Sequence, residues 1–338
     1  MRLAAHDFMD FNATATPQMG ADGCFDPSHP SNAGLSSIWN SSSPLFELHR
    51  TKYSHITIAD FWVASANAVI RQTSNNALNL RATFQWGRID SSTCIGSGAR
   101  LPIPSRCRQV EAVFLMRMGL TWREAVALLG AHTLGRGNAA VSLLCFQHSP
   151  PYRCCLSYFY CTSFRLVLWS SWYLERQQHS CPGEKLFTIR TKNHVETISI
   201  HELIKFVRVQ LLVLKVFDKQ YYRELLDNNW RMIFNNGPQD WTTGNLPNDR
   251  MMLNTDICLK FDIDDQINQV AAPCTTRSIQ NVPTCPVYGS TSTRRQASDA
   301  VDEFANGADS TFYTAFSGAW NKATAKGQSG LRPLAASC

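Results

Sequence analysis

The chain has 338 residues, of which 44% are hydrophobic and 17% are charged, so it is long enough to enclose a sizeable core. Its net charge of +6 is spread thinly, and no run of lysine and arginine accompanies aromatic residues, so we expect no nucleic-acid partner. Three basic residues interrupt the most apolar long stretch, residues 203–216, so we expect no membrane span. The first residues lack the features of a signal peptide, whereas the twelve cysteines favour an oxidising compartment.

The first segment, residues 1–11, is predicted to be a helix. Arg2 and His6 lie four residues apart, so their side chains project from one helical face. Any helix can offer such a pair by chance, and the alternative is a solvated arginine beside a surface histidine.

A loop rich in turn formers and oxygen-bearing side chains follows at residues 20–35. Asp7, Asp22 and Asp26, together with carbonyl groups of this loop, either form a site for a hard cation of the calcium type or belong to a solvated loop.

The middle of the chain is predicted to contain two more helices, at residues 56–71 and 108–119. Between them, Cys94 and Cys107 bracket a loop rich in glycine and proline that a disulfide between them could close, although the sequence does not fix the pairing. A first lobe is expected to end near residue 120.

A buried helix is predicted to follow. Thr121 and Glu124 form a capping box, the residues after them are almost wholly apolar, and Gly135 suits a left-handed residue at the helix end. His132 would then lie in the last turn. On its own this histidine is more typical of a hydrogen-bonded core residue than of a metal ligand.

Later in the chain, the segment YYRELLDNNW at residues 221–230 is predicted to be helical and to end at Asn228 and Asn229, and residues 302–320 are predicted to be a closing helix. The tail from residue 322 is polar and small, so we expect it to be loose.

The segments RLAAHD, GADG, PSNAGL, GRID, LLGAHTLGR and MLNTD occur in this order, which resembles the plant, fungal and bacterial haem peroxidase superfamily. The pair HD and GADG is similar to calcium-bearing secreted fungal members, whereas PSNAGL and MLNTD look more like the cytochrome c and ascorbate peroxidase branch. The resemblance implies a mostly α-helical, two-lobed fold with haem b between the lobes. The implied organisation is a distal lobe at 1–120, a proximal ligand helix at 121–138, an insertion at 139–216, the rest of the proximal lobe at 217–321 and a tail at 322–338.

The same resemblance implies the roles of five residues. His132 is expected to be the axial ligand of the haem iron, and Asp256 to accept a hydrogen bond from its other ring nitrogen. On the opposite side His6 would move the proton of the peroxide, Arg2 would stabilise charge on the departing oxygen, and Asn32 would fix the tautomer of His6. For Asn32 and Asp256 the alternative is ordinary turn chemistry.

The calcium ligands of the family are only partly matched in this sequence. Asp7, Gly20 and Asp22 match the family's distal ligands, but Cys24 stands where a hydroxyl ligand is usual, and a thiol suits a hard cation poorly. Thr133 matches the first ligand of a proximal calcium site whose remaining ligands would lie beyond residue 137, where the resemblance fails. We expect one distal cation.

Three features depart from the family pattern. Ala5 stands where a large distal aromatic residue is usual, and the chain begins at the catalytic helix, which is expected of a truncated chain. Residues 139–216 carry five cysteines and no resemblance to the family. They are either a lid or partner-binding insertion or, as we favour, sequence foreign to the natural protein, such as translated intron.

The sequence therefore predicts a haem-dependent enzyme that reduces hydrogen peroxide to water and oxidises a small reducing substrate one electron at a time. Ascorbate is disfavoured, because Val141 stands nearest to the place where ascorbate peroxidases have an arginine. The alternatives are an inactive haem-binding relative and a cysteine-rich extracellular binding module.

Overall fold

The computed structural model describes residues 1–135, 173–174, 186–191, 194–199, 216–233, 240–244, 250–263, 274–278 and 282–333. The chain divides into two compact units, Met1–Arg136 with Lys215–Cys338, and Gly137–Leu214. The predicted distal and proximal lobes both belong to the first unit, and the second unit is nearly coextensive with the predicted insertion at 139–216.

In the second unit the structure describes three strands, β2 (Tyr173–Leu174), β3 (Leu186–Thr191) and β4 (His194–Ser199). They form an antiparallel sheet in the order β2-β3-β4. The rest of the insertion, including Val141, lies outside the described residues.

The first unit is mostly helical, as the sequence predicts. Its longer helices are α1 (Arg2–Phe8), α3 (Ile58–Thr73), α6 (Trp122–Leu129), α10 (Gln220–Asp227), α12 (Arg295–Asn306) and α13 (Asp309–Thr324). Shorter helical turns are η1 (Pro30–Asn32), α2 (Pro44–Leu48), η2 (His49–Tyr53), α4 (Ser97–Arg100), α5 (Arg108–Val110), η3 (Glu111–Arg117), η4 (Gly130–Leu134) and α11 (Asn254–Ile257). No helix in the described part of the chain is both long and apolar enough to cross a membrane.

Two small antiparallel sheets complete this unit. One joins β5 (Arg231–Ile233), β6 (Asp240–Thr242) and β7 (Met251–Leu253), and β7 leads directly into α11. The other pairs β1 (Gln85–Trp86) with β8 (Arg332–Pro333).

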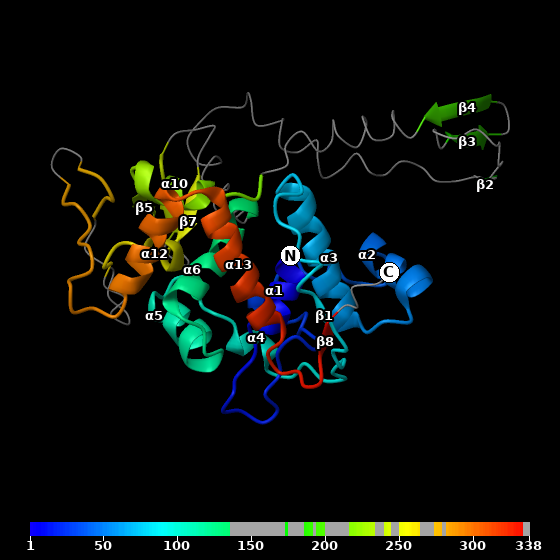
Figure 1. The fold of residues 1–338 in the computed structure, drawn as a ribbon, viewed down its shortest axis with the longest axis horizontal. Helices are drawn as coiled ribbons and strands as arrows, with labels where there is room; N and C mark the ends of the chain where they lie inside the picture. The colour runs from blue at the N-terminus through cyan, green and yellow to red at the C-terminus, as the bar shows by residue number, and fades with distance from the viewer. Residues whose placement is uncertain are drawn as a thin grey trace, which may run out of the picture. The chain divides into compact units, whose positions relative to one another are not determined.

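Helix α13 lies at the centre of this unit, beside α6 and α1 (Figure 1). Its Trp320 ring meets Phe8 of α1 edge-on at 5.5 Å between centroids, and its indole N–H donates to Asn67 of α3. One apolar core therefore connects the helices of the predicted distal lobe with those of the predicted proximal lobe.

The predicted capping box of α6 is confirmed, because Thr121 and Glu124 each accept a hydrogen bond from the other's backbone N–H. The left-handed helix end predicted at Gly135 is wrong. The chain tightens into the 3₁₀ turn η4 after α6, and Gly135 has a φ of −69°. His132 thus lies on η4.

Residues 302–320, predicted as one helix, are divided between α12 and α13. The chain is extended at Gly307 and Ala308, and Asp309 begins the next helix. The helix predicted to end at Asn228 and Asn229 is α10, and its C-cap is Asn228.

The predicted loose tail is also wrong as far as residue 333. Lys326 O accepts from Ala21 N, and the Gln328 side chain donates to Ala21 O. Strand β8 then pairs with β1. Polar composition suggested looseness, but backbone hydrogen bonds hold this segment.

A disulfide between Cys94 and Cys107 is not formed. The described disulfides are Cys24–Cys94, Cys107–Cys258 and Cys274–Cys285. Each of the two cysteines thus bonds to a residue far from the loop that they bracket in the sequence.

Candidate active site

The first half of the site is a hydrogen-bonded pair between His132 on η4 and Asp256 on α11. The His132 Nδ1 and Asp256 Oδ1 atoms lie 2.8 Å apart. Because a carboxylate can only accept, Nδ1 carries the proton and Nε2 keeps a free lone pair. The His132 side chain is 41% exposed and that of Asp256 only 4%, so the imidazole faces open space and its partner is buried behind it.

Charge and burial act in opposite directions on this pair. Burial alone would lower the pKa of His132, but the charge of Asp256 and its hydrogen bond raise it more, so the pKa of His132 is raised. Burial would raise the pKa of Asp256, but His132, the Leu253 N–H and the Tyr221 hydroxyl together keep it below its ordinary value. Asp256 is therefore an anion at neutral pH.

Helix α11 is held in place from several sides, which fixes the direction of Asp256. The Leu253 N–H donates to Asp256 Oδ2 at 2.8 Å. Asn254 accepts from the Trp241 indole and donates to Ser105 O, and the Cys107–Cys258 disulfide follows one residue after α11. A short helix with these anchors presents a carboxylate with little freedom.

The second half of the site brings together Arg2, His6 and Asn32. His6 Nδ1 lies 2.9 Å from Asn32 Oδ1, and Arg2 Nε donates to His6 Nε2 at 3.3 Å. An arginine cannot accept, so Nε2 is the acceptor and Nδ1 carries the proton. The contact with Asn32 thus favours the tautomer in which His6 Nε2 is the unprotonated nitrogen.

Asn32 is itself held by a contact that the sequence analysis missed. Its amide nitrogen donates to Asp26 O at 2.8 Å, which turns Oδ1 toward His6. Asn32 is 1% exposed. The contact is to a backbone carbonyl, which no side-chain pattern can indicate.

The two halves are close enough to interact electrostatically. Burial, together with the nearby charges of Arg2 and His132, lowers the pKa of His6 to about 4, although the hydrogen bond with Asn32 acts in the opposite direction. His6 on α1 and His132 on η4 both belong to the first compact unit, and the charge of His132 acts on His6.

The residues predicted to bind a distal calcium ion lie close together. In the structure they are joined by hydrogen bonds that hold the loop at residues 20–24. Asp7 accepts from the backbone N–H groups of Asp22, Gly23 and Cys24 at 3.1–3.3 Å, and the Gly20 carbonyl accepts from Asp22 N. Burial and the charges of Asp22 and Asp10 raise the pKa of Asp7. Within the described residues, no group of three or more His, Cys, Asp or Glu side chains is arranged to hold a metal ion.

The other predicted calcium residue, Thr133, donates from its hydroxyl to Val216 O at 3.3 Å. Its supposed fellow ligands beyond residue 137 lie outside the described residues. Ala5, expected beside His6, is partly buried against the core.

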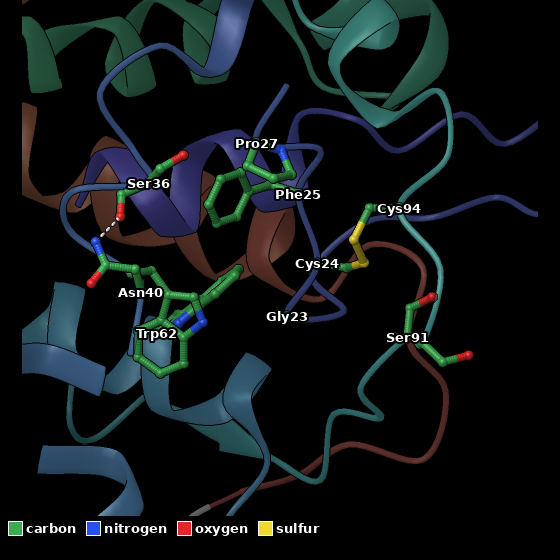
Figure 2. Close-up of a pocket in the computed structure, with 11 residues that line it drawn as sticks. Gly23, Cys24, Phe25, Pro27, Ser36, Asn40, Trp62, Ser91 and Cys94 are labelled. Carbon is green, nitrogen blue, oxygen red and sulfur yellow. Dashed lines mark hydrogen bonds between the residues drawn. A yellow bond between two sulfur atoms is a disulfide. The ribbon is translucent and has the colours of Figure 1, made fainter. Parts of the chain in front are cut away.

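A separate pocket of about 440 Å³ lies near the distal loop and contains none of the predicted site residues. Figure 2 shows the Cys24–Cys94 disulfide on one side of it and Trp62 on the other. Phe25, which also lines it, directly precedes the Asp26 carbonyl that holds Asn32. One loop thus forms part of the pocket wall and supports the active site.

Tyr221 contacts the site residues although the sequence did not single it out. Its hydroxyl donates to Asp256 Oδ1 at 2.7 Å, the same oxygen that accepts from His132. Two adjacent tyrosines in an amphipathic helix gave a signal, because a buried hydroxyl requires a hydrogen-bond partner.

Comparison with known proteins agrees with this geometry. The family described as peroxidase matches residues 1–272. The probable L-ascorbate peroxidase 8, chloroplastic, of Oryza sativa subsp. japonica is 37% identical over 150 residues, which are 41% of this chain and 30% of that protein. The mitochondrial cytochrome c peroxidase of Emericella nidulans is 30% identical over 196 residues, which are 56% of this chain and 50% of that protein.

The L-ascorbate peroxidase 3 of Arabidopsis thaliana is 31% identical over 141 residues, covering 41% of this chain and 46% of that protein. The chain therefore spans half or less of the length of these relatives. The family match, however, covers most of the chain and includes both histidines. The chain belongs to the haem peroxidase superfamily.

Proposed function

We propose that this chain is a haem peroxidase that binds haem b through His132, reduces hydrogen peroxide to water and oxidises a reducing substrate in one-electron steps. The observation that supports the proposal most strongly is the hydrogen bonding of the two histidines, which fixes which ring nitrogen of each carries the proton. His132 is hydrogen-bonded at Nδ1 and free at Nε2, and His6 is hydrogen-bonded at Nδ1 with Nε2 as the acceptor.

The residues on the proximal side fit a haem. A neutral imidazole whose other nitrogen donates to a carboxylate is the usual form of a histidine ligand, because the carboxylate raises its basicity. The imidazole of His132 is 41% exposed although its partner is buried, as a ligand directed toward a planar cofactor requires. The haem supplies the redox centre at which peroxide is bound and reduced.

The residues on the distal side supply proton transfer. Reduction of hydrogen peroxide takes two electrons and two protons and gives two molecules of water. His6 Nε2 is placed to accept the proton of the peroxide and to return it to the departing oxygen. The Arg2 guanidinium, hydrogen-bonded to Ala33 O at 2.9 Å, holds a positive charge where negative charge develops.

The alternatives have less support. An inactive haem-binding relative needs no basic nitrogen opposite the ligand, yet Asn32 and Asp26 together orient His6. A cysteine-rich binding module would not need an exposed His132 held by a buried Asp256.

The reducing substrate is proposed only as a class, a small one-electron donor. Relatives bear the names of ascorbate and cytochrome c peroxidases. The position on which the sequence argument against ascorbate depends, Val141, lies outside the described residues.

We also propose a calcium ion at Asp7, Gly20 and Asp22. The support is that Asp22 Oδ1 is buried and has no hydrogen-bond partner within the described structure, beside two further buried carboxylates, Asp7 and Asp10. A cation would relieve their mutual repulsion. Calcium added to chelator-treated protein should raise its unfolding temperature, and Asp22→Asn should abolish the rise. Equal unfolding temperatures with and without calcium would remove this ion from the proposal.

The haem assignment is tested by the absorption spectrum of the purified chain mixed with haem b, before and after peroxide. His132→Ala should lose the histidine-ligated spectrum. His55→Ala, at an exposed histidine, is the matched control and should keep it. A His132→Ala spectrum identical to that of the wild type would show that His132 is not the ligand.

A further inference from the structure

Two donors share one oxygen of Asp256. The His132 Nδ1–H and the Tyr221 hydroxyl approach Oδ1 at 2.8 and 2.7 Å, whereas Oδ2 accepts only the Leu253 N–H among the described contacts. The Tyr221 ring stands edge-on to the imidazole, at 84° between planes and 6.1 Å between centroids. Tyr221 therefore donates a hydrogen bond to the same oxygen atom, Asp256 Oδ1, that accepts the hydrogen bond of His132.

The tyrosine hydroxyl has no other described acceptor, and its position is fixed by packing. Tyr221 is 5% exposed and lies on α10 directly before Tyr222, whose ring meets it edge-on at 5.1 Å. Tyr222 donates instead to Val126 O of α6. The two neighbouring tyrosines therefore make different contacts. Tyr222 connects α10 with α6, and Tyr221 donates a hydrogen bond to the carboxylate of Asp256.

Sharing an acceptor has a definite electrostatic consequence. A hydrogen bond to a carboxylate oxygen disperses its negative charge, which makes that oxygen a weaker acceptor for a second donor. The weaker the acceptor, the less electron density the imidazole passes to a metal at Nε2. The hydroxyl of Tyr221 therefore opposes the effect of Asp256 on His132.

We propose that Tyr221 is a positioning residue that limits the basicity of the His132 ligand by donating to Asp256 Oδ1, and so sets the reduction potential of the bound haem. This inference rests on the proposed function, because it requires His132 to be the iron ligand.

The test compares Tyr221→Phe with Tyr222→Phe in the haem-loaded full chain. Tyr221→Phe keeps the ring and removes the donor, so Asp256 becomes a stronger acceptor and the ferric form is favoured. We expect about a tenfold shift of the one-electron equilibrium toward ferric haem, which corresponds to a midpoint potential lower by about 59 mV. Tyr222→Phe also removes a buried hydroxyl, but one bonded to a backbone carbonyl, and should leave the potential unchanged.

A second readout is the iron–histidine stretching frequency of the ferrous protein, which should rise in Tyr221→Phe alone. Tyr221→Leu, which also lacks the donor, replaces it if the phenylalanine variant does not fold. In an Asp256→Asn background the Tyr221→Phe change should have no further effect on the potential.

The outcomes separate the two claims. If the wild type binds haem through His132 but Tyr221→Phe has the wild-type potential or a higher one, the role of Tyr221 is refuted and the peroxidase proposal stands. If both tyrosine variants lower the potential equally, the change comes from loss of packing around α10 and not from the hydrogen bond to Asp256, and the inference is wrong. If the wild type does not bind haem, both claims fall.

Discussion

The two site histidines differ in the way their neighbours act on their protons. His6 is buried beside positive charge, so its pKa is lowered to about 4. His132 faces a carboxylate instead, whose charge and hydrogen bond raise its pKa. His6 is therefore kept unprotonated at Nε2. His132 donates a hydrogen bond from Nδ1 and keeps a lone pair at Nε2 for a metal ion.

Replacing His6 tests the proton transfer. His6→Leu should slow the reaction with peroxide by about 10²–10⁴, the usual value of a positioned acid–base group, while haem binding stays close to wild type. Stopped-flow mixing of the haem-loaded protein with peroxide measures the rate, and a haem titration measures binding. Equal rates in the two proteins would exclude His6 from the reaction.

The same residue predicts a pH dependence. The peroxide reaction should be constant above about pH 5 and fall as the pH drops through about 4, where His6 becomes protonated. The ordinary histidine pKa of 6.5 lies above this value, so between the two the unfolded chain binds more protons, and stability should fall as the pH is lowered through that window. A midpoint of the rate profile near 6.5 would show that His6 is not in the buried, positive surroundings described.

At the scale of elements, the approach of α6 to its neighbours depends on Gly130. A Cβ atom at this position would meet the Tyr222 hydroxyl and the Phe312 ring. Gly130 therefore lets α10 and α13 pack closely against the end of α6, from which η4 carries His132. The position of η4, the turn that carries His132, therefore depends on packing as well as on its own sequence.

Gly130→Ala should destabilise the protein by about 1–3 kcal/mol, the usual cost of overpacking, and should lower haem affinity by moving η4. The matched control is Gly318→Ala on α13, where nothing lies within 4 Å of an added Cβ. That change should stabilise the helix by roughly 0.5–1 kcal/mol. Denaturant unfolding of both variants gives the comparison, and equal stabilities would contradict the packing described.

The sequence predicted elements whose ends are marked by local chemistry. Thr121 and Glu124 mark the start of α6, and Asn228 the end of α10. It did not predict η4 or the held tail, because both depend on partners far away in the chain. The paired histidines followed from ordered motifs, whereas Tyr221 and the Asp26 carbonyl required the three-dimensional structure.

At the scale of the whole molecule, Thr133 and Val216, described residues on either side of the second unit, lie close together. The Thr133 hydroxyl donates to Val216 O, and Phe217 N donates to Thr73 O. A short connection can therefore replace the second compact unit. Closure entropy grows only slowly with loop length, so the length of the insertion is not itself a large cost.

Replacing the insertion, residues 139–216, with a short glycine-rich loop should raise soluble yield and keep or raise haem content per chain. The expected cause is the loss of apolar sequence such as residues 211–215, because apolar runs favour aggregation when they are exposed. The same replacement in His132→Ala is the control and should raise the yield without haem. If the shortened protein loses haem that the full chain binds, the insertion is a working part of the enzyme.

The hydrogen bonds between Ala21 and residues 326–328 also bear on the order of events during synthesis. These partners are up to 307 positions apart, so at about 5–20 residues per second the second arrives roughly 15–60 s after the first. The helix that carries His6 is thus made well before the segment that supports the loop behind it. We expect the cofactor to be captured productively only after this last segment docks, so a chain ended at residue 325 should hold haem more weakly than the full chain.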